Sequence, residues 1–342
     1  MPFTKHLHIA IILLLSLFGV ACHKVESFEN DYYGNFDALW TMVDEHYCFF
    51  EQKDVDWNEI RSRYRDRINP DMTVNEFFDL LSDMLAELKD GHVNLSSRFN
   101  TFYYREWWSN YPQDFSMRTL EQYYLDFDYR TTNGIIYKVL NGDIGYIYYP
   151  SFSYHVSDTS LDYILAWFKN CKGLIIDVRD NGGGNLTNID KFVARFIREK
   201  TLGGYIRHKT GKGHGDFSEP YPFYYEPASD SFVHWDKQIA VLCNRSTFSA
   251  ANDFVSVMKS LPQVTVIGAC TGGGGGMPFT YEIPIGWSLR LSASPISNAL
   301  DESIEDGIEP TEGFALHAWS DQLANGVDAI LDRAIMFLRE AD

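Results

Sequence analysis

The feature that most constrains the fold is a pair of strand–turn–helix units in the second half of the chain. "KGLIIDV" (172–178) is a continuous apolar run, followed by the glycine turn "RDNGGGN" and a helical pattern through Phe192 and Phe196. "QIAVLC" (238–243) is a second such run, followed by "NRST" and a helical pattern from Ala250. Continuously apolar strands that alternate with helices are typical of a largely parallel sheet with helices on its faces. The sequence therefore predicts an α/β core with strand–helix repeats.

Further patterns extend this core in both directions. "GIIYKVL" and "GYIYYPSF" flank "NGD" and predict a hairpin, because Asn141-Gly142 favours a primed turn. "VTVIGAC" and "WSLRLSA" predict two more strands, and the apolar spacing from Val327 to Leu338 predicts a last helix. Residues 203–235, rich in glycine, proline and aromatic residues, form an insertion between two units that we interpret as a hairpin flap.

Three helical patterns precede the core. They run from Phe36 to Tyr47, from Trp57 to Tyr64 and from Phe77 to Leu88. Thr73 and Glu76 form a capping box ahead of the third, and Gly91 would supply a left-handed stop after it. The sequence thus predicts a short linker and a small helical-bundle domain over 22–95, an aromatic-rich connector over 96–133, and a core over 134–342.

Residues 1–21 are typical of an export signal, with a basic Lys5, the apolar run "IAIILLLSLFGVA", and a small residue, Ala21, before Cys22. A cysteine in this place resembles a bacterial lipobox, which predicts lipidation of Cys22 and anchoring in the cell envelope, in the outer membrane or periplasm. The alternative is an ordinary cleaved secretory signal. Both interpretations predict an exported protein.

Composition excludes several classes of partner and cofactor. The formal charge of −18 becomes −18 − 1 = −19 once the signal and its single lysine are removed, and such an acidic chain repels nucleic acid and anionic headgroups. The four remaining cysteines, which show no CxxC spacing, are predicted to be free thiols rather than a disulfide pair: Cys48, Cys171, Cys243 and Cys270. No metal site and no cofactor is predicted.

Ser249 is the first candidate for chemistry, since it falls at the start of a helix that follows a buried strand. Backbone N–H groups there lack intrahelical acceptors, and the helix dipole adds partial positive charge. The N–H of Ala250 could donate to an oxyanion, with a second donor from "DNGGGN". The alternative is a serine that only caps the helix.

Five segments carry a resemblance: "GYIYYPSF", "GLIIDVRDNGGGN", "VLCNRSTFSAAN", "VIGACTGGGGG" and "GIEPT". In order and spacing they resemble the C-terminal processing (tail-specific) and tricorn family of serine peptidases, over about residues 134–340. The resemblance implies a crotonase/ClpP-like core. The family nucleophile falls on Ser249, with Asn252 in place of the acid of the S-A-x-E motif, and the oxyanion donors fall on the N–H groups of Ala250 and Gly183.

The resemblance also implies which residue is the general base. The processing branch has a lysine where this chain has Gly274, within a glycine run that is not a phosphate loop and that we interpret as a flexible turn. The tricorn branch uses a histidine from the preceding domain, and "LKDGHVNL" places it on His92, with Gly91 where tricorn-like enzymes have a serine. The resemblance also implies a catalytic triad, whose third member is a glutamate. It falls on Glu305, with Glu302 as second choice, in "DESIEDGIEPT".

Two further expectations follow. Roughly 40 residues separate Leu95 from Ile135, too few for the PDZ module that the family often carries, so no PDZ domain is predicted. His208 and His214, in the insertion, are expected to face solvent rather than replace the base.

The sequence as a whole predicts an exported serine endopeptidase with a Ser-His-Glu triad, acting on peptide or protein substrates. The alternative is an inactive family member that binds peptides or apolar ligands. Substrate and oligomeric state stay open.

Overall fold

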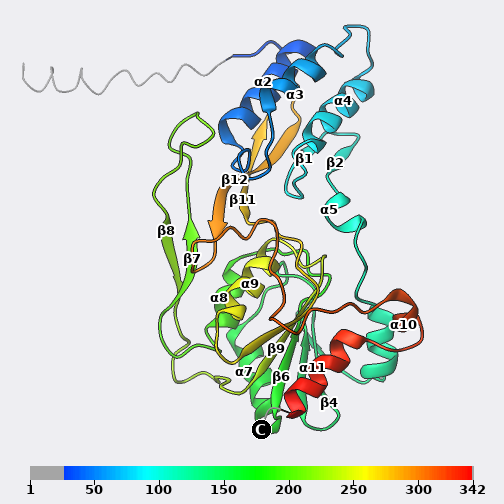
Figure 1. Cartoon of the computed structure of the whole chain (residues 1–342), viewed down its shortest axis with the longest axis vertical. Coiled ribbons are helices and arrows are strands. Elements are labelled where there is room, and N and C mark those ends of the chain that lie inside the picture. Colours follow the sequence, from blue (N-terminus) through cyan, green and yellow to red (C-terminus); the bar gives the residue numbers. More distant parts are fainter. Residues whose placement is uncertain (1–26, 341–342) are drawn as a thin grey trace, which may run out of the picture.

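The computed structural model describes residues 27–340, so the predicted signal and Cys22 lie outside the described residues. Figure 1 shows an elongated molecule with two parts along its long axis. The lower part is a sheet flanked by helices, and the upper part consists of the first helices and long strands.

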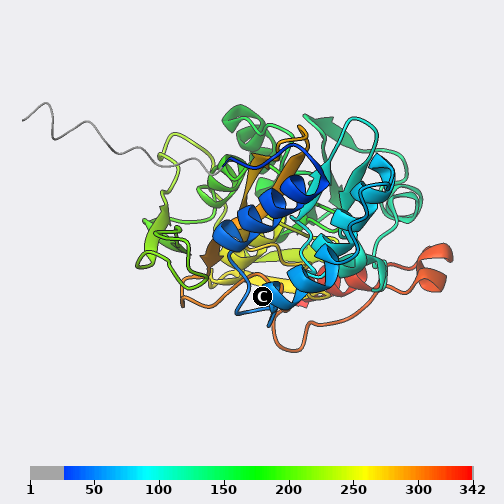
Figure 2. The same cartoon turned by 90° about the horizontal axis from the view of Figure 1, so that it is seen from above.

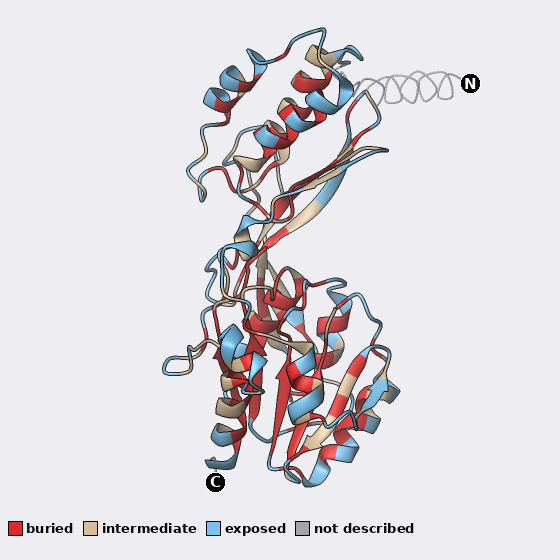
Figure 3. Ribbon diagram, turned by 90° about the vertical axis from the view of Figure 1, so that its right-hand side faces the viewer, coloured by how far each residue is buried: buried red, intermediate tan, exposed pale blue. Residues whose placement is uncertain are grey.

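The lower part is built on a six-stranded sheet in the order β10-β9-β6-β5-β4-β3. β5, β6, β9 and β10 are parallel to one another, whereas β4 and β3 are antiparallel additions. The strands are β3 (Arg130–Thr132), β4 (Ile135–Leu140), β5 (Ile144–Tyr148), β6 (Gly173–Asp177), β9 (Ile239–Cys243) and β10 (Val264–Gly268). All residues of the four parallel strands are buried or nearly so, as continuous apolar runs predict. Figure 3 shows these strands in red.

Helices cover both faces of this sheet. Alternate side chains of the parallel strands contact one set of helices, and the side chains between them contact the other. One face carries α7 (Asp158–Trp167), the short η2 (Phe168–Asn170), α8 (Thr187–Val193) and α9 (Ala250–Lys259). The other carries α6 (Met117–Thr119), η1 (Leu120–Tyr124), α10 (Ser320–Ala324) and α11 (Ala329–Glu340). The predicted mixed α/β fold is confirmed.

The predicted hairpin between β4 and β5 has the expected turn. Leu140 pairs with Ile144, and both Asn141 (φ 53°) and Gly142 (φ 82°) have positive φ. Two consecutive positive φ angles define a type I′ turn, whose twist matches that of the flanking strands.

The upper part contains a second six-stranded sheet, in the order β2-β1-β12-β7-β8 with β11 also paired to β12. Its strands are β1 (Asn94–Ser96), β2 (Thr101–Tyr103), β7 (Thr201–Ile206), β8 (Tyr221–Tyr225), β11 (Gly276–Glu282) and β12 (Ser288–Ser297). The predicted strand "WSLRLSA" is β12, in this antiparallel sheet and not among the parallel strands. Its start alternates between half-buried and buried residues, the mark of a strand with one covered face.

The three predicted helices are present but pack on this sheet as well as on one another. They are α2 (Tyr32–His46), α3 (Trp57–Arg65) and α4 (Val74–Ala86). Seen from above, α2 lies across the orange strands (Figure 2), and its apolar side chains share one cluster with Leu289 and Leu291 of β12. The upper part is therefore a helix layer on a sheet rather than a bundle of helices alone.

The predicted start of α4 is correct, whereas the predicted left-handed residue after its end is wrong. The capping box of Thr73 and Glu76 is present. The left-handed residue after the helix, however, is Lys89 (φ 48°), and not Gly91. A Cβ at position 91 would lie 2.6 Å from Trp107 Nε1 and 2.9 Å from Phe248 Cζ, so this glycine is needed for close packing.

The connector and the insertion are two of the segments that connect the two parts. The connector contains β2 and α5 (Glu106–Ser109) before it reaches the lower sheet at α6. The insertion forms the antiparallel hairpin of β7 and β8, whose tip reaches α2. There His214 Nε2 lies 2.8 Å from Asp44 Oδ1 and its ring stacks on Phe50 at 4.1 Å, so His214 is only partly exposed, and the histidine that contacts Ser249 is His92.

Within residues 27–340, no helix has the length and apolar character needed to cross a membrane. The four cysteines of this part of the chain are free thiols, as predicted.

Candidate active site

Ser249 occupies a strained turn between β9 and α9. Its φ and ψ angles are 57° and −127°, a region that non-glycine residues rarely adopt and that occurs mainly at functional sites. Neighbouring segments hold this conformation, since the Ser249 N–H donates to the Gly273 carbonyl (2.9 Å) and the Phe248 N–H to the Asn181 carbonyl (3.0 Å). The Ser249 hydroxyl makes no capping hydrogen bond to α9. A serine held in this way on a sharp strand-to-helix turn presents its hydroxyl outward from the sheet.

His92 meets this hydroxyl from the upper part of the molecule. It lies in the loop between α4 and β1, and its Nε2 is 2.9 Å from Ser249 Oγ, although the two residues are 157 positions apart. The imidazole is 3% exposed and rests on the Phe248 ring, with 4.7 Å between the ring centroids. The hydrogen-bond distance allows His92 to take the hydroxyl proton when Nε2 is unprotonated.

Burial also sets the protonation state of His92. Desolvation lowers the pKa of His92 to about 4, because the imidazolium loses hydration, while the negative charge of Asp90 partly opposes this shift. His92 is therefore neutral at neutral pH and available as a base.

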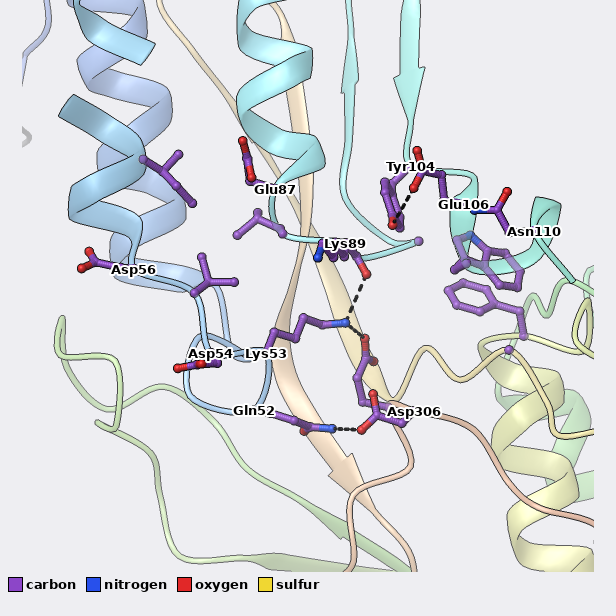
Figure 4. Close-up of a pocket in the computed structure, with 18 of the residues that line it drawn as sticks. Gln52, Lys53, Asp54, Asp56, Glu87, Lys89, Tyr104, Glu106, Asn110 and Asp306 are labelled. Atoms are coloured by element: carbon purple, nitrogen blue, oxygen red, sulfur yellow. Dashed lines mark hydrogen bonds and ion pairs between the residues drawn. The ribbon is translucent and has the colours of Figure 1, made fainter. Parts of the chain in front are cut away.

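Glu305 lies in the same buried region but faces other partners. Its Oε1 pairs with Lys53 Nζ at 3.0 Å, and its Oε2 accepts the Gly275 N–H at 2.9 Å. Burial and the charge of Asp90 raise the pKa of Glu305, and Lys53 opposes them. Lys53 Nζ also donates to the Lys89 carbonyl at 3.3 Å, a contact that Figure 4 shows. Among the described contacts, none joins Glu305 to His92. The second choice, Glu302, is exposed and accepts a hydrogen bond from Asn298.

The two predicted oxyanion donors, the N–H groups of Ala250 and Gly183, differ in whether they already have a hydrogen-bond acceptor. Ala250 is the first residue of α9, so its N–H has no acceptor within the helix. Gly183 (φ 93°) packs against the nucleophile, and a Cβ there would lie 2.8 Å from Ser249 Cβ and 2.9 Å from Ala250 N. Its N–H, however, donates to Asn181 Oδ1 at 2.9 Å. In this conformation the Ala250 N–H has no acceptor within the helix, whereas the Gly183 N–H is already bonded to Asn181.

Comparison with known proteins identifies the family of this chain. A sequence model of peptidase family S41 matches residues 143–313, and one of the tricorn protease C1 domain matches residues 28–86. A protein of Parabacteroides merdae described as a candidate peptidase is 45% identical, with a TM-score of 0.86 over 91% of this chain and 97% of that one. The chain belongs to peptidase family S41, a family of serine-type peptidases.

More distant similarities agree on the fold. Mature CPAF has a TM-score of 0.68 at 13% identity, over 91% of this chain and 98% of that chain. A protein of Chlamydia trachomatis serovar D is 28% identical over 159 residues, which are 45% of this chain and 24% of that protein.

The glycine run of this S41 chain is not the flexible turn that we expected. Residues 271–276 are buried, and Gly273 and Gly274 have φ angles of 80° and 83°. A Cβ at position 273 would lie 1.7 Å from the Glu305 carbonyl oxygen, and one at 276 would lie 2.6 Å from Phe49 Cε2 and Ser292 Cβ. The glycines allow one backbone segment to pass between the nucleophile turn and the loop of Glu305.

Gly274 lies directly beside the ring of His92. A Cβ at this position would lie 2.6 Å from the Phe248 ring and 3.1 Å from His92 Cε1. The space into which a side chain at 274 would extend is thus occupied by the imidazole and its supporting ring.

Sequence reasoning did not show that several further residues hold the site together. Asn252 donates to the Ile304 carbonyl (2.9 Å) and accepts from Thr271 Oγ1 (2.6 Å), so it ties α9 to the loop before Glu305. Arg245 donates to the Trp107 carbonyl (2.6 Å) and fixes α5 against the core. The family resemblance marked Asn252 only as the residue in place of the acid, and no local pattern marks Arg245 or Lys53.

A cavity of 840 Å³ opens beside the site, between the upper helices, α5 and the core loops. Its lining includes Gly91 and Phe248, the chain neighbours of His92 and Ser249, together with Lys53 and Glu305 (Figure 4). His92 and Ser249 do not themselves line it. In residues 27–340 there is no cluster of three or more His, Cys, Asp and Glu side chains suited to a metal ion.

Proposed function

We propose that this S41 chain is a serine endopeptidase in which Ser249 is the nucleophile and His92 the general base. The observation that carries the proposal is the 2.9 Å contact between Ser249 Oγ and His92 Nε2, made by two residues 157 positions apart. The strained backbone of Ser249 supports it, because such strain persists only where the surrounding structure enforces it.

The proposed reaction follows from this pair. Ser249 Oγ bonds to the peptide carbonyl carbon while its proton passes to His92 Nε2. The carbon–nitrogen bond then breaks, and the imidazolium returns the proton to the leaving amine. A water molecule, deprotonated by His92, attacks the acyl carbon, and Ser249 leaves with its proton restored. The Ala250 N–H, with that of Gly183 once it turns away from Asn181, would stabilise the oxyanion.

Glu305 as the third member stays a prediction. Its carboxylate lies within the same buried region, and through Gly275 it fixes the glycine segment on which His92 rests. A carboxylate in a triad holds the imidazole tautomer and stabilises the imidazolium.

We also propose the domain division and the localisation expected from the sequence. A signal at residues 1–21 and a lipidated Cys22 would anchor the protein in the cell envelope, and peptide or protein substrates would meet it there. The short elements of residues 96–133 support a chain without a PDZ module. Mass spectrometry of the N-terminal peptide from membranes tests the lipid on Cys22.

A fluorophosphonate probe tests the proposed activity. The wild-type protein should be labelled covalently at Ser249, as read by peptide mass spectrometry, and should cleave unfolded casein. Ser249→Ala should lose both activities. An unlabelled, folded wild-type protein would contradict the proposal.

One observation favours the alternative, an inactive family member that binds peptides or apolar ligands. The Gly183 N–H donates to Asn181 Oδ1, which leaves the oxyanion with one fewer donor, and loss of one donor reduces turnover by on the order of 10²- to 10³-fold. The same labelling experiment separates the two functions, since an inert Ser249 does not react.

A further inference from the structure

We propose that Trp107 is a positioning residue for His92: its indole holds the Phe248 ring on which the imidazole rests, and it separates the imidazole from the 840 Å³ cavity. This inference rests on the proposed function, because the position of the imidazole affects the reaction only if His92 is the base. Sequence reasoning placed Trp107 in the aromatic-rich connector and assigned it no role of its own.

Three aromatic rings in contact lead from α5 to the proposed base. The Trp107 ring stacks on the Phe248 ring, with 4.3 Å between the centroids and 26° between the planes. The Phe248 ring in turn contacts the His92 imidazole, at 4.7 Å and 50°. Phe248 also precedes Ser249 in the chain, so a displaced Phe248 would disturb both members of the pair. The position of Phe248 therefore matters to the reaction, and Trp107 packs directly on it.

The indole packs against two glycines, one in each part of the molecule. A Cβ at position 91 would lie 2.6 Å from Trp107 Nε1, and a Cβ at position 272 would lie 2.3 Å from Trp107 Cζ3. Gly91 comes directly before His92, whereas Gly272 belongs to the glycine run of the core. The indole thus contacts the loop of His92 and the glycine run at once, and it holds one against the other.

The cavity beside the site gives the indole a second role. Trp107 and Phe248 line this cavity, whereas His92 and Ser249 do not, so the two rings lie between the cavity and the reacting pair. Other side chains of the lining are charged, as Figure 4 shows, and a roomy cavity with charged walls holds water. Without the indole, water would reach the imidazole from this side.

A backbone contact attaches α5 to the core. No residue of α5 is buried, and Arg245 Nε donates to the Trp107 carbonyl at 2.6 Å. The same guanidinium donates from Nη1 to the Thr271 carbonyl at 3.0 Å and lies over the Tyr111 ring, 4.2 Å from its centroid. These contacts do not involve the indole, so a smaller side chain at position 107 can leave α5 in place.

Trp107→Ala tests the inference. The second-order rate of fluorophosphonate labelling at Ser249 should fall by about tenfold or more at neutral pH, because small displacements of reacting groups are costly. The acid inflection of the rate should also move to higher pH, toward the ordinary histidine value of about 6.5, because a hydrated imidazole is protonated more readily. The charged groups that face the ring, Asp90, Arg290 and Lys53, are the same in both proteins. A smaller loss at neutral pH, or an inflection that stays at its wild-type pH, would overturn the inference.

Trp108→Ala is the matched control. Trp108 is the next residue of α5, and its ring has an edge contact with the Trp107 ring at 6.4 Å, whereas no ring contact among the described residues joins it to Phe248. This variant should be labelled within about threefold of the wild-type rate and keep the wild-type inflection. Trp107→Phe, which keeps a ring against Phe248, should recover most of the rate that Trp107→Ala loses. Equal losses and equal shifts in the two alanine variants would overturn the inference, because the packing of α5 as a whole would then be responsible.

NMR of ¹⁵N-labelled histidine separates a failure of this inference from a failure of the proposed function. The pKa of the His92 imidazole should be higher in Trp107→Ala than in the wild type, by about one unit or more, whether or not Ser249 reacts with the probe. Where Trp107→Ala fails to fold, Trp107→Phe takes its place, and a smaller rise is expected because a phenyl ring fills only part of the space of an indole. Equal pKa values in variant and wild type would overturn the inference. A raised pKa together with an inert Ser249 would contradict the proposed function and leave the role of the indole intact.

Discussion

The two parts of the molecule contribute different things to the proposed active site. The four central strands of the lower sheet are parallel and mostly apolar, and they supply backbone geometry, namely the strained Ser249 and the glycine turn before α8. The upper part supplies ionisable side chains, since His92, Asp90 and Lys53 all come from its helices and loops. A continuously buried sheet can fix a turn rigidly, but it cannot hold a charged cluster without hydrogen-bonding partners. The site is therefore a property of the junction between the parts.

The junction itself is made of specific contacts. β11 and β12 run from the glycine segment into the upper sheet, where β12 packs against α2. The buried pair of Lys53 and Glu305 joins the turn after α2 to the loop before α10, and the exposed pair of Gln52 and Asp306 (2.8 Å) lies beside it. Three changes test how much each kind of contact matters.

Of these three, the largest effect is expected from Gly274→Ala, which adds one Cβ where the two parts meet. This atom would lie 2.6 Å from the Phe248 ring and 3.1 Å from His92 Cε1, so the imidazole has to move away from Ser249. Because small displacements of reacting groups are costly, the labelling rate should fall about 10²-fold.

Gly142→Ala is the matched control for this change. Gly142 has almost the same φ angle (82° against 83°), but a Cβ there meets nothing within 4 Å. It should lower stability by about 1 kcal/mol and leave the labelling rate unchanged. Equal losses of activity in the two variants would show that backbone strain, and not contact with His92, is responsible.

A smaller effect is expected from Lys53→Met, which leaves the buried Glu305 without its cation. The free energy of unfolding, measured in urea, should fall by about 3 kcal/mol, because an uncompensated buried charge is costly. Gln52→Ala, at the neighbouring exposed contact, should cost less than about 1 kcal/mol. Equal costs would mean that the junction does not depend on the buried pair.

The smallest effect concerns pH. His92 must be neutral to act, and its pKa is lowered to about 4, so the labelling rate should be flat from about pH 5.5 to neutral and halve near pH 4. The charged groups that face the ring are Asp90, Arg290 and Lys53. A histidine in water would instead give an inflection near its ordinary pKa of about 6.5. An inflection there would mean that the ring is better hydrated than its burial indicates.

Most of the fold was predictable because its signals are local. Apolar runs gave the parallel strands, helical spacing gave α2 to α4, and Asn141-Gly142 gave the primed turn. β12 was assigned to the wrong sheet, because the partner of a strand depends on contacts far away in the sequence. The prediction for Gly91 was wrong for a similar reason. A glycine is needed there because Trp107 and Phe248 pack closely against it, and not because α4 ends there.

The site was predictable only in part. The residues around Ser249 suggested a nucleophile, but His92 was found through a family resemblance, as nothing local links positions 92 and 249. The glycine run was misjudged because a sequence does not show what surrounds a bare backbone. Asp90 and Lys53 escaped notice because an acid or a lysine in a loop is usually solvated, and only the folded chain shows that these two are buried.

The central claim is that an imidazole from the upper part activates a hydroxyl of the lower part. Its most direct test is the second-order rate of fluorophosphonate labelling in His92→Ala, with His214→Ala as a control at another contact between the two parts. The account predicts a fall on the order of 10⁴-fold for His92→Ala and a change of less than about threefold for the control. Labelling of His92→Ala within tenfold of the wild type would contradict it.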